Sequence, residues 1–290
     1  MFLEKINNFW NLLEKKYPKP TYIKKINILE FSVLKKAFDE ENISFIEKII
    51  ENLYLNQEAY ILKRAVSNKL RDVCIALANS YNKEQKSNFF KMLDGCPNFH
   101  RIIDPEIAIK YSIYAIKHSF YFYNWNAKSN NEKFLKEEVY SNWSYIKYLS
   151  GLKKNEYENN IPSDLIVDRL QIVNYPSGGG ELRDHTDPIK NIRVVNGIIL
   201  SKFGKDFNEG GFYFKDKNNK KINIEKDLDV GDSVCFYGSI VHGVDKIDPD
   251  SDLDWSLEKG RWFLGMYSNE SDHVQNRVTA KDLSQSVAIK

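Results

Sequence analysis

The sequence predicts an α+β protein in which a region of helices precedes a jelly roll of short strands. Apolar residues recur at helical spacing through much of the first hundred positions. After Asp164 the chain changes to short runs of β-favouring residues separated by turn residues. Strands at such short intervals, without helices between them, are typical of a sandwich or jelly roll and not of a parallel α/β sheet.

The helical region is expected to span residues 1–105 and to form a layer or cap over the mouth of the barrel. Its apolar spacing predicts a helix at the N-terminus, a second over 43–55, and a third over 57–81 that would be the longest of this region. Prolines and turn residues separate these segments, for example at Pro18 and Pro97.

The jelly-roll domain with its flanking helices is expected over 106–290, with its core at about 165–270. An aromatic belt begins near Ile107, and we interpret it mainly as core residues where helices meet a sheet, with one or two members left open as substrate-lining. A helical pattern follows over 132–152. Six later runs predict strands, at 170–175, 194–200, 211–214, 222–224, 233–237 and 262–267.

Composition excludes several classes of protein. The chain has 42 basic and 40 acidic residues, so its net charge of +2 gives no electrostatic support for nucleic-acid binding. No apolar run is long enough to span a membrane, and the N-terminus lacks a signal-peptide pattern, which favours a cytoplasmic protein. The three cysteines are odd in number and form no CxxC motif, so we expect them to pack as small apolar residues. The oligomeric state is not predicted.

His185 and Asp187, followed by His242 and then Arg261, form the candidate site. In an extended strand, residues two apart project on the same side, so His185 and Asp187 can converge on one ion. Two imidazoles and one carboxylate on one face of iron(II) leave open coordination positions, as in non-haem iron oxygenases. The guanidinium of Arg261 can hold a carboxylate bidentately, so it is a candidate anchor for an acid co-substrate that chelates the metal.

Four segments in order resemble the iron(II)- and 2-oxoglutarate-dependent dioxygenase superfamily, and within it the prolyl-hydroxylase-like branch. Residues 174–187 look like the family's tyrosine, proline, glycine-rich turn and metal-binding H-x-D. Residues 208–212 resemble its acidic-glycine-glycine step, and residues 230–236 its turn before the distal histidine. Residues 260–264 look like the basic anchor that opens a late strand. The resemblance implies a double-stranded β-helix core, that is, a cupin-like jelly roll.

Carried over residue by residue, the resemblance implies that His185, Asp187 and His242 bind Fe(II) and act in catalysis. It also implies that Arg261 pairs with 2-oxoglutarate and that Tyr175 lines the co-substrate pocket. O2 would be the second co-substrate, and ascorbate is left open as a further reductant. The carboxylate of Asp187 favours hydroxylation, desaturation or cyclisation over chlorination.

The expected reaction is hydroxylation of an unactivated C–H bond, with release of succinate and CO2. The favoured substrate is a free amino acid, a small metabolite or a carrier-bound intermediate. Two alternatives stay open: a protein or peptide prolyl hydroxylase, and a cupin-like metalloprotein that does not use 2-oxoglutarate. Arg183, Arg193 and Asn196 are candidate substrate contacts, although the favoured interpretation of each is an ordinary surface or strand-edge polar residue.

Two features depart from the family pattern. The interval from His242 to Arg261 is 261 − 242 = 19 residues, longer than in many relatives, and it leaves Lys246 as a rival anchor. We expect the inserted acidic stretch to form a loop beside the site. Leu200 stands near the place where several relatives carry a tyrosine that helps to bind the acid.

Overall fold

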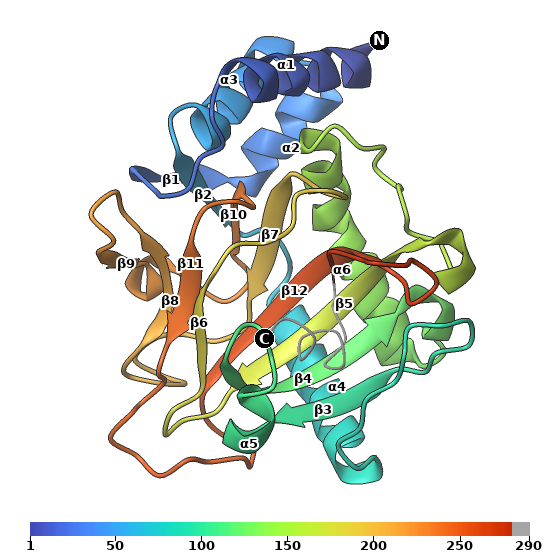
Figure 1. The fold of residues 1–290 in the computed structure, drawn as a ribbon, viewed down its shortest axis with the longest axis vertical. Coiled ribbons are helices and arrows are strands. Elements are labelled where there is room, and N and C mark those ends of the chain that lie inside the picture. Colours follow the sequence, from blue (N-terminus) through green and yellow to red (C-terminus); the bar gives the residue numbers. More distant parts are fainter. Residues whose placement is uncertain (280–290) are drawn as a thin grey trace.

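The computed structural model describes residues 1–279, and its strands form one sheet that folds over on itself (Figure 1). The helices are α1 (Phe2–Lys16), α2 (Phe31–Asp39), α3 (Ile43–Tyr54), α4 (Lys69–Glu84), α5 (Pro105–Ala108) and α6 (Asn130–Leu149). The strands are β1 (Lys25–Glu30), β2 (Glu58–Lys63), β3 (Phe99–Ile103), β4 (Ala115–Tyr123), β5 (Ile166–Tyr175), β6 (Glu181–His185), β7 (Val194–Ile199), β8 (Gly211–Lys215), β9 (Lys221–Asn223), β10 (Ser233–Tyr237), β11 (His242–Asp245) and β12 (Arg261–Glu270).

The strands divide into a main sheet and a smaller second sheet. The main sheet runs β1-β2-β10-β7-β12-β5-β4, with β3 on the other side of β4, and the second sheet runs β6-β11-β8-β9. One end of β4 joins the two, because Ala115 and Ile116 pair with β6 while residues 118–123 pair with β5. The expected α+β jelly roll is confirmed, and all six strand runs predicted after Asp164 contain strands.

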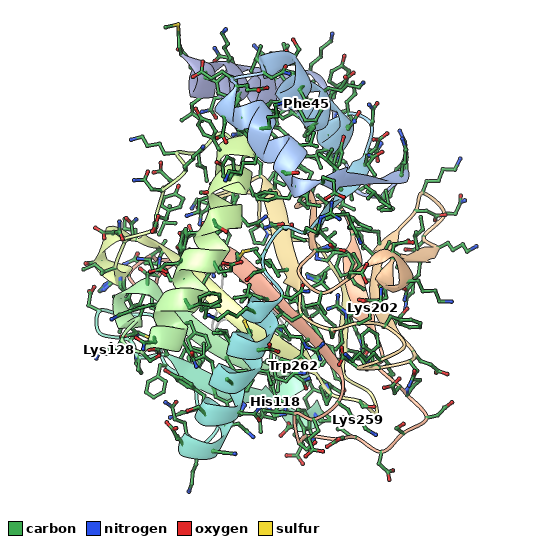
Figure 2. All side chains as sticks on the ribbon, turned by 180° about the vertical axis from the view of Figure 1, so that it is seen from behind. Phe45, His118, Lys128, Lys202, Lys259 and Trp262 are labelled. Carbon is green, nitrogen blue, oxygen red and sulfur yellow. The ribbon has the colours of Figure 1, made fainter. Side chains whose placement is uncertain are left out.

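Alternation along the main sheet separates its two faces. Phe120 and Ile172 point outward and pack in the same apolar core as Val139 and Trp143 of α6. Viewed from behind, α4 and α6 lie across this outer face (Figure 2). Neighbouring residues such as Tyr121 point the opposite way, toward the interior of the roll.

The first 105 residues are not purely helical, and the predicted helix over 57–81 is wrong for its first half and correct from Lys69 onward. Residues Glu58–Lys63 form β2, which pairs in parallel with β1 and antiparallel with β10 of the jelly roll. Helix α4 begins only at Lys69. The N-terminal residues therefore contribute two strands to the edge of the main sheet, in addition to the helices above it (Figure 1).

The predicted helix over 132–152 corresponds to α6, which begins two residues earlier and carries a capping box. The Ser129 side chain accepts a hydrogen bond from the Glu132 backbone amide, and Glu132 accepts one in return. The aromatic belt that precedes it is mostly strand β4, where Phe120 and Phe122 pack against the helices. The interpretation of the aromatic belt as core residues is confirmed for Phe120 and Phe122.

Cys74, Cys96 and Cys235 are buried free thiols, as expected from their number and spacing. Within residues 1–279, no helix combines the length and apolarity that crossing a membrane requires.

Candidate metal and co-substrate site

His185, Asp187 and His242 come together in the interior of the roll. His185 ends β6 and pairs directly with His242, which begins β11, and their ring centroids are 4.2 Å apart. Asp187 follows β6, and its backbone amide donates to the carbonyl of Gly238 at 2.8 Å. One potential ligand atom from each of the three residues lies within 4.8 Å of the other two. Because these atoms are close enough to share one ion, the triplet fits the predicted metal site.

Both imidazoles are oriented by their own backbone. Nδ1 of His185 lies 2.9 Å from the Arg183 carbonyl, and Nδ1 of His242 lies 2.9 Å from the Ile240 carbonyl. A carbonyl can only accept, so each Nδ1 carries the proton and donates it. This arrangement leaves Nε2 unprotonated as a ligand, which is the tautomer that a metal-binding histidine needs.

Local electrostatics favour the ligating protonation states of His185 and Asp187. Burial, assisted by the neighbouring His242, lowers the pKa of His185 to about 4, so its ring is neutral at pH 7. Burial alone would raise the pKa of Asp187. The contact with His242, whose Nε2 is 3.4 Å away, together with His185 and Lys117 outweighs burial and places that pKa below its ordinary value. A neutral imidazole and a carboxylate are donors suited to iron(II).

Arg261 and Tyr175 line the same cavity as the three metal-site residues. The cavity measures about 530 Å³ including its opening to solvent, and its other walls are largely apolar. Tyr175 ends β5 directly opposite Arg261 at the start of β12, and the guanidinium carbon lies 6.0 Å from the phenol ring centroid. Arg261 is 1% exposed, so an acid that reached it would be removed from water. Both residues therefore line the cavity that holds the three candidate metal ligands, and their roles stay predictions.

Glu225 is a buried partner of Arg261 that the sequence did not reveal. One of its carboxylate oxygens accepts hydrogen bonds from Nε of Arg261 and from the backbone amide of Phe212, the latter at 2.7 Å. The other oxygen is buried and has no hydrogen-bond partner among residues 1–279. Glu225 lies in a short turn after β9, and no motif marked it. It fixes the plane of the guanidinium from the side.

Phe263 and Tyr267 also line the cavity and were not identified from the sequence. They follow Arg261 on β12 at even intervals, so they share its face of the sheet. That alternation is the signal that would have found them.

The glycine-rich turn packs against the long insert before Arg261. The amides of Gly178 and Gly179 both donate to the carbonyl of Ile247, and the carbonyl of Ser177 accepts from the amide of Asp254. Gly178 has a φ of +86°, and a Cβ there would collide with the backbone of Asp252. Glycine is needed at position 178 both for the positive φ and for the close approach of the Asp252 backbone. The insert lies beside the turn that leads into β6, and no residue of 245–258 lines the metal-site cavity.

The remaining candidate residues lie elsewhere. Lys246 is exposed, so Arg261 is the basic residue that faces the cavity. Arg193 bonds Glu14 of α1, and Asn196 bonds Asn142 of α6, and neither lines the cavity, which agrees with the favoured interpretation of both as ordinary polar residues. Arg183 is exposed and lies over the ring of Tyr114. Leu200 is a fully buried core residue.

Neither a protein-family model nor a curated protein matches this sequence. Solved structures match in fold. A full-length Neurospora crassa protein in complex with alpha-KG and thymine aligns with a TM-score of 0.54 and 13% identity, over 91% of this chain and 97% of that one. The same protein with alpha-KG and 5-formyluracil aligns with a TM-score of 0.53 and 13% identity, over 89% and 88%. A prolyl-4-hydroxylase from Pseudomonas putida aligns with a TM-score of 0.40 and 12% identity, over 68% and 86%.

The two Neurospora crassa alignments cover most of both chains, so they establish the architecture. The chain has the jelly-roll fold of the 2-oxoglutarate-dependent oxygenases, which is the fold that the sequence resemblance implies. At these identities the similarity establishes fold, and the activity must be argued from the site.

Proposed function

We propose that this protein is an iron(II)- and 2-oxoglutarate-dependent dioxygenase that hydroxylates an unactivated C–H bond of a small molecule. The observation that carries the proposal is the meeting of His185, Asp187 and His242 with buried Arg261 in one cavity. A metal site alone would suit many chemistries. The additional buried guanidinium supplies a place for the distal carboxylate of 2-oxoglutarate.

Each residue has a separate task in this proposal. His185, Asp187 and His242 would hold Fe(II), which supplies O2 activation coupled to decarboxylation of 2-oxoglutarate to succinate and CO2. Arg261 would bind the distal carboxylate, and Glu225 keeps its guanidinium in place. Tyr175 and Phe263 close the cavity around the co-substrate and exclude water from it.

The fold neighbour supports a small-molecule substrate. The Neurospora crassa complexes contain thymine or 5-formyluracil together with alpha-KG, and their alignments cover most of this chain. We therefore place the substrate of this protein among small metabolites, free amino acids and carrier-bound intermediates.

Calorimetry on the purified protein tests the proposal. Protein loaded with Fe(II) under anaerobic conditions should bind 2-oxoglutarate, and exposure to O2 should then produce succinate. The Arg193→Ala variant is a matched control, because this arginine lies away from the cavity and should leave 2-oxoglutarate binding unchanged. Metal binding without 2-oxoglutarate binding would instead identify a cupin-like metalloprotein, and succinate formation driven only by proline-containing peptides would identify a peptide hydroxylase.

A further inference from the structure

A second cavity lies on the inner face of the main sheet, beside the metal and co-substrate cavity. It measures about 580 Å³ including its opening to solvent, and β3, β4 and β5 supply much of its wall. These strands lie side by side next to β12 (Figure 1). None of the residues given a role in the proposed function lines this second cavity.

The second cavity holds more positive charge than its own residues neutralise. Among residues 1–279, Arg101, Arg169 and Arg277 line it together with a single carboxylate, Asp272. Asp272 pairs with Arg277 at 2.8 Å. Within residues 1–279, neither Arg101 nor Arg169 forms an ion pair with a carboxylate. Arg101 is nevertheless 7% exposed, and Nε of Arg169 is buried without a hydrogen-bond partner.

Buried cations without counter-ions are costly in a protein that binds nothing there, because desolvation of the charge is not offset. A bound anion would supply the missing partner. Unpaired buried polar groups that converge on a cavity are therefore a mark of a ligand site.

The second cavity is lined by planar aromatic side chains as well as by charged groups. The guanidinium carbon of Arg101 lies 4.8 Å from the ring centroid of Phe89, and that of Arg169 lies 5.0 Å from the ring centroid of Tyr121. Phe89 and Phe90 line the cavity and are each 38% exposed, which is unusual for such large apolar side chains. Aromatic and guanidinium planes together favour a planar ring by stacking.

Tyr267 connects the two cavities. It lines the metal-site cavity, and it pairs on β12 with Arg169 of β5, whose guanidinium carbon lies 5.6 Å from the Tyr267 ring centroid. Arg261 lies six residues earlier on β12, a distance of about 20 Å along the strand. The second cavity thus adjoins the metal-site cavity at the end far from the proposed 2-oxoglutarate anchor.

We propose that the second cavity is the substrate-recognition site of the same enzyme, and that it takes a small molecule combining a planar ring with an anionic group. Arg101 and Arg169 bind the anion, the aromatic walls hold the ring, and the substrate reaches past Tyr267 toward the metal residues. The inference rests on the proposed function for its chemistry. The binding of such a ligand does not require metal or 2-oxoglutarate.

Calorimetry with six probes separates the two recognition elements. Indole-3-acetate and phenyl phosphate carry both a ring and an anion, 3-methylindole and phenol carry only the ring, and acetate and inorganic phosphate carry only the anion. At least one ring acid should bind at least tenfold more tightly than both of its simpler counterparts. Comparison of indole-3-acetate with phenyl phosphate distinguishes a carboxylate from a phosphate ligand.

The variants Arg101→Met and Arg169→Gln should each weaken binding of that ring acid at least tenfold. Arg64→Gln is the matched control, because Arg64 is an exposed arginine that pairs with Glu30 and does not line the second cavity. This substitution should leave binding of the ring acid unchanged. Loss of an unpaired buried charge should leave the Tm of Arg101→Met equal to or above that of the unaltered protein, which separates lost recognition from lost folding.

Four results would overturn the inference: no binding of either ring acid, equal affinity for ring acids and neutral rings, equal affinity for ring acids and ringless anions, or unchanged binding in both arginine variants. Failure of the proposed function looks different. In that case the ring acid binds and depends on Arg101 and Arg169, but 2-oxoglutarate does not bind the Fe(II)-loaded protein. Conversely, 2-oxoglutarate binding without ring-acid binding leaves the enzyme proposal standing and removes only this site.

Discussion

At the scale of single residues, the pairing of Glu225 with Arg261 determines how the proposed anchor works. The carboxylate of Glu225 already neutralises the guanidinium and occupies Nε. An incoming acid therefore meets an oriented donor and not an uncompensated charge. Its recognition depends on hydrogen-bond geometry, which is the property in which arginine exceeds lysine.

Arg261→Ala should weaken 2-oxoglutarate binding by about 10- to 100-fold, the effect of losing hydrogen bonds to a charged group worth about 1.5–3 kcal/mol. Metal content should be unchanged, because Arg261 is not among the three residues whose ligand atoms converge. Calorimetry and metal analysis on the same preparation test both statements. Loss of metal in this variant would assign Arg261 to the metal site instead. Arg261→Lys should recover only part of the affinity, since it restores charge without the planar fork.

Glu225→Gln should retain most 2-oxoglutarate affinity, because an amide oxygen still accepts from Arg261 and Phe212. Glu225→Ala should lower both that affinity and the free energy of unfolding, the latter by about 3–5 kcal/mol, since it leaves a buried guanidinium unpaired. Urea unfolding and calorimetry measure the two effects. Equal behaviour of the two variants would show that Glu225 does not hold the guanidinium.

At the scale of elements, a buried ion pair attaches α6 to the main sheet. Lys147 of α6 pairs with Asp168 of β5, and both side chains are almost completely buried. Tyr140 donates to the same carboxylate at 2.6 Å and Ser268 at 2.8 Å. Together with the Asn196–Asn142 hydrogen bond, this network is a polar part of a largely apolar contact, and it fixes where the helix lies on the strands.

Lys147→Met should lower the free energy of unfolding by about 3–5 kcal/mol, because it leaves the Asp168 carboxylate buried without its cation. The double variant Lys147→Met, Asp168→Leu should lose much less than the sum of the two single variants. A double-mutant cycle by urea unfolding measures the difference. Additive losses would show that the pair does not act as a unit.

The two histidines of β3 and β4 make stability depend on pH. His100 and His118 are each 1% exposed and lie 3.0 Å apart between ring nitrogens. Burial lowers the pKa of His100 to about 4; burial and the neighbouring His100 lower that of His118 to about 3. The folded state therefore holds both rings neutral, whereas the unfolded chain protonates them near pH 6.5.

Acid should therefore destabilise the protein through this histidine pair. The unfolded state binds more protons below pH 6.5, so the free energy of unfolding should fall as the pH drops from about 6.5 toward 4, by up to about 1.4 kcal/mol per pH unit for each ring. The variant His100→Phe, His118→Leu should flatten this dependence between pH 6.5 and 5. Thermal unfolding across that range measures it, and an unchanged slope would contradict the assignment.

At the scale of the whole molecule, sequence reasoning succeeded where a pattern was regular and local. The H-x-D triplet predicted that His185 and Asp187 converge, and the alternating strands around it predicted the jelly roll, because both depend on period-two spacing. The second cavity was not predictable in the same way. Arg101 and Arg169 are far apart in sequence and meet only through the β3–β4 and β4–β5 pairings.

Strand β2 was wrongly predicted as helix, although its residues are adjacent in sequence. Ala59, Tyr60, Ile61 and Leu62 form a continuous buried run. Such a run does not alternate, so its periodicity cannot distinguish a strand from a segment of buried helix. The clear helical pattern of α4 begins six residues after β2 ends, so the predicted helix was extended in the N-terminal direction over β2. Its pairing partners, β1 and β10, specify the extended conformation.

Removal of residues 1–63 takes away two strands of the main sheet as well as the helices above it. We therefore expect the remaining jelly roll to be poorly soluble. The cut exposes the edge of β10 and the apolar side chains that packed beneath α1 and α3. Removal of residues 1–16 alone keeps β2 in place and should be less damaging. Size-exclusion chromatography and circular dichroism of both shortened chains test this, and a monomeric, folded chain beginning after Lys63 would show that β2 is dispensable.

The position of β2 also has a consequence for how the chain emerges during synthesis. Leu62 pairs with Ser233, so the two partners are 233 − 62 = 171 residues apart. β2 leaves the ribosome long before β10 exists, and for that interval its apolar residues and open hydrogen-bonding edge are unmatched. The helices α1 and α3 precede β2 in the chain, so they are already made and can cover part of that strand. The N-terminal strands therefore form one edge of the main sheet before their partner exists, and β10, in the last third of the chain, completes the pairing.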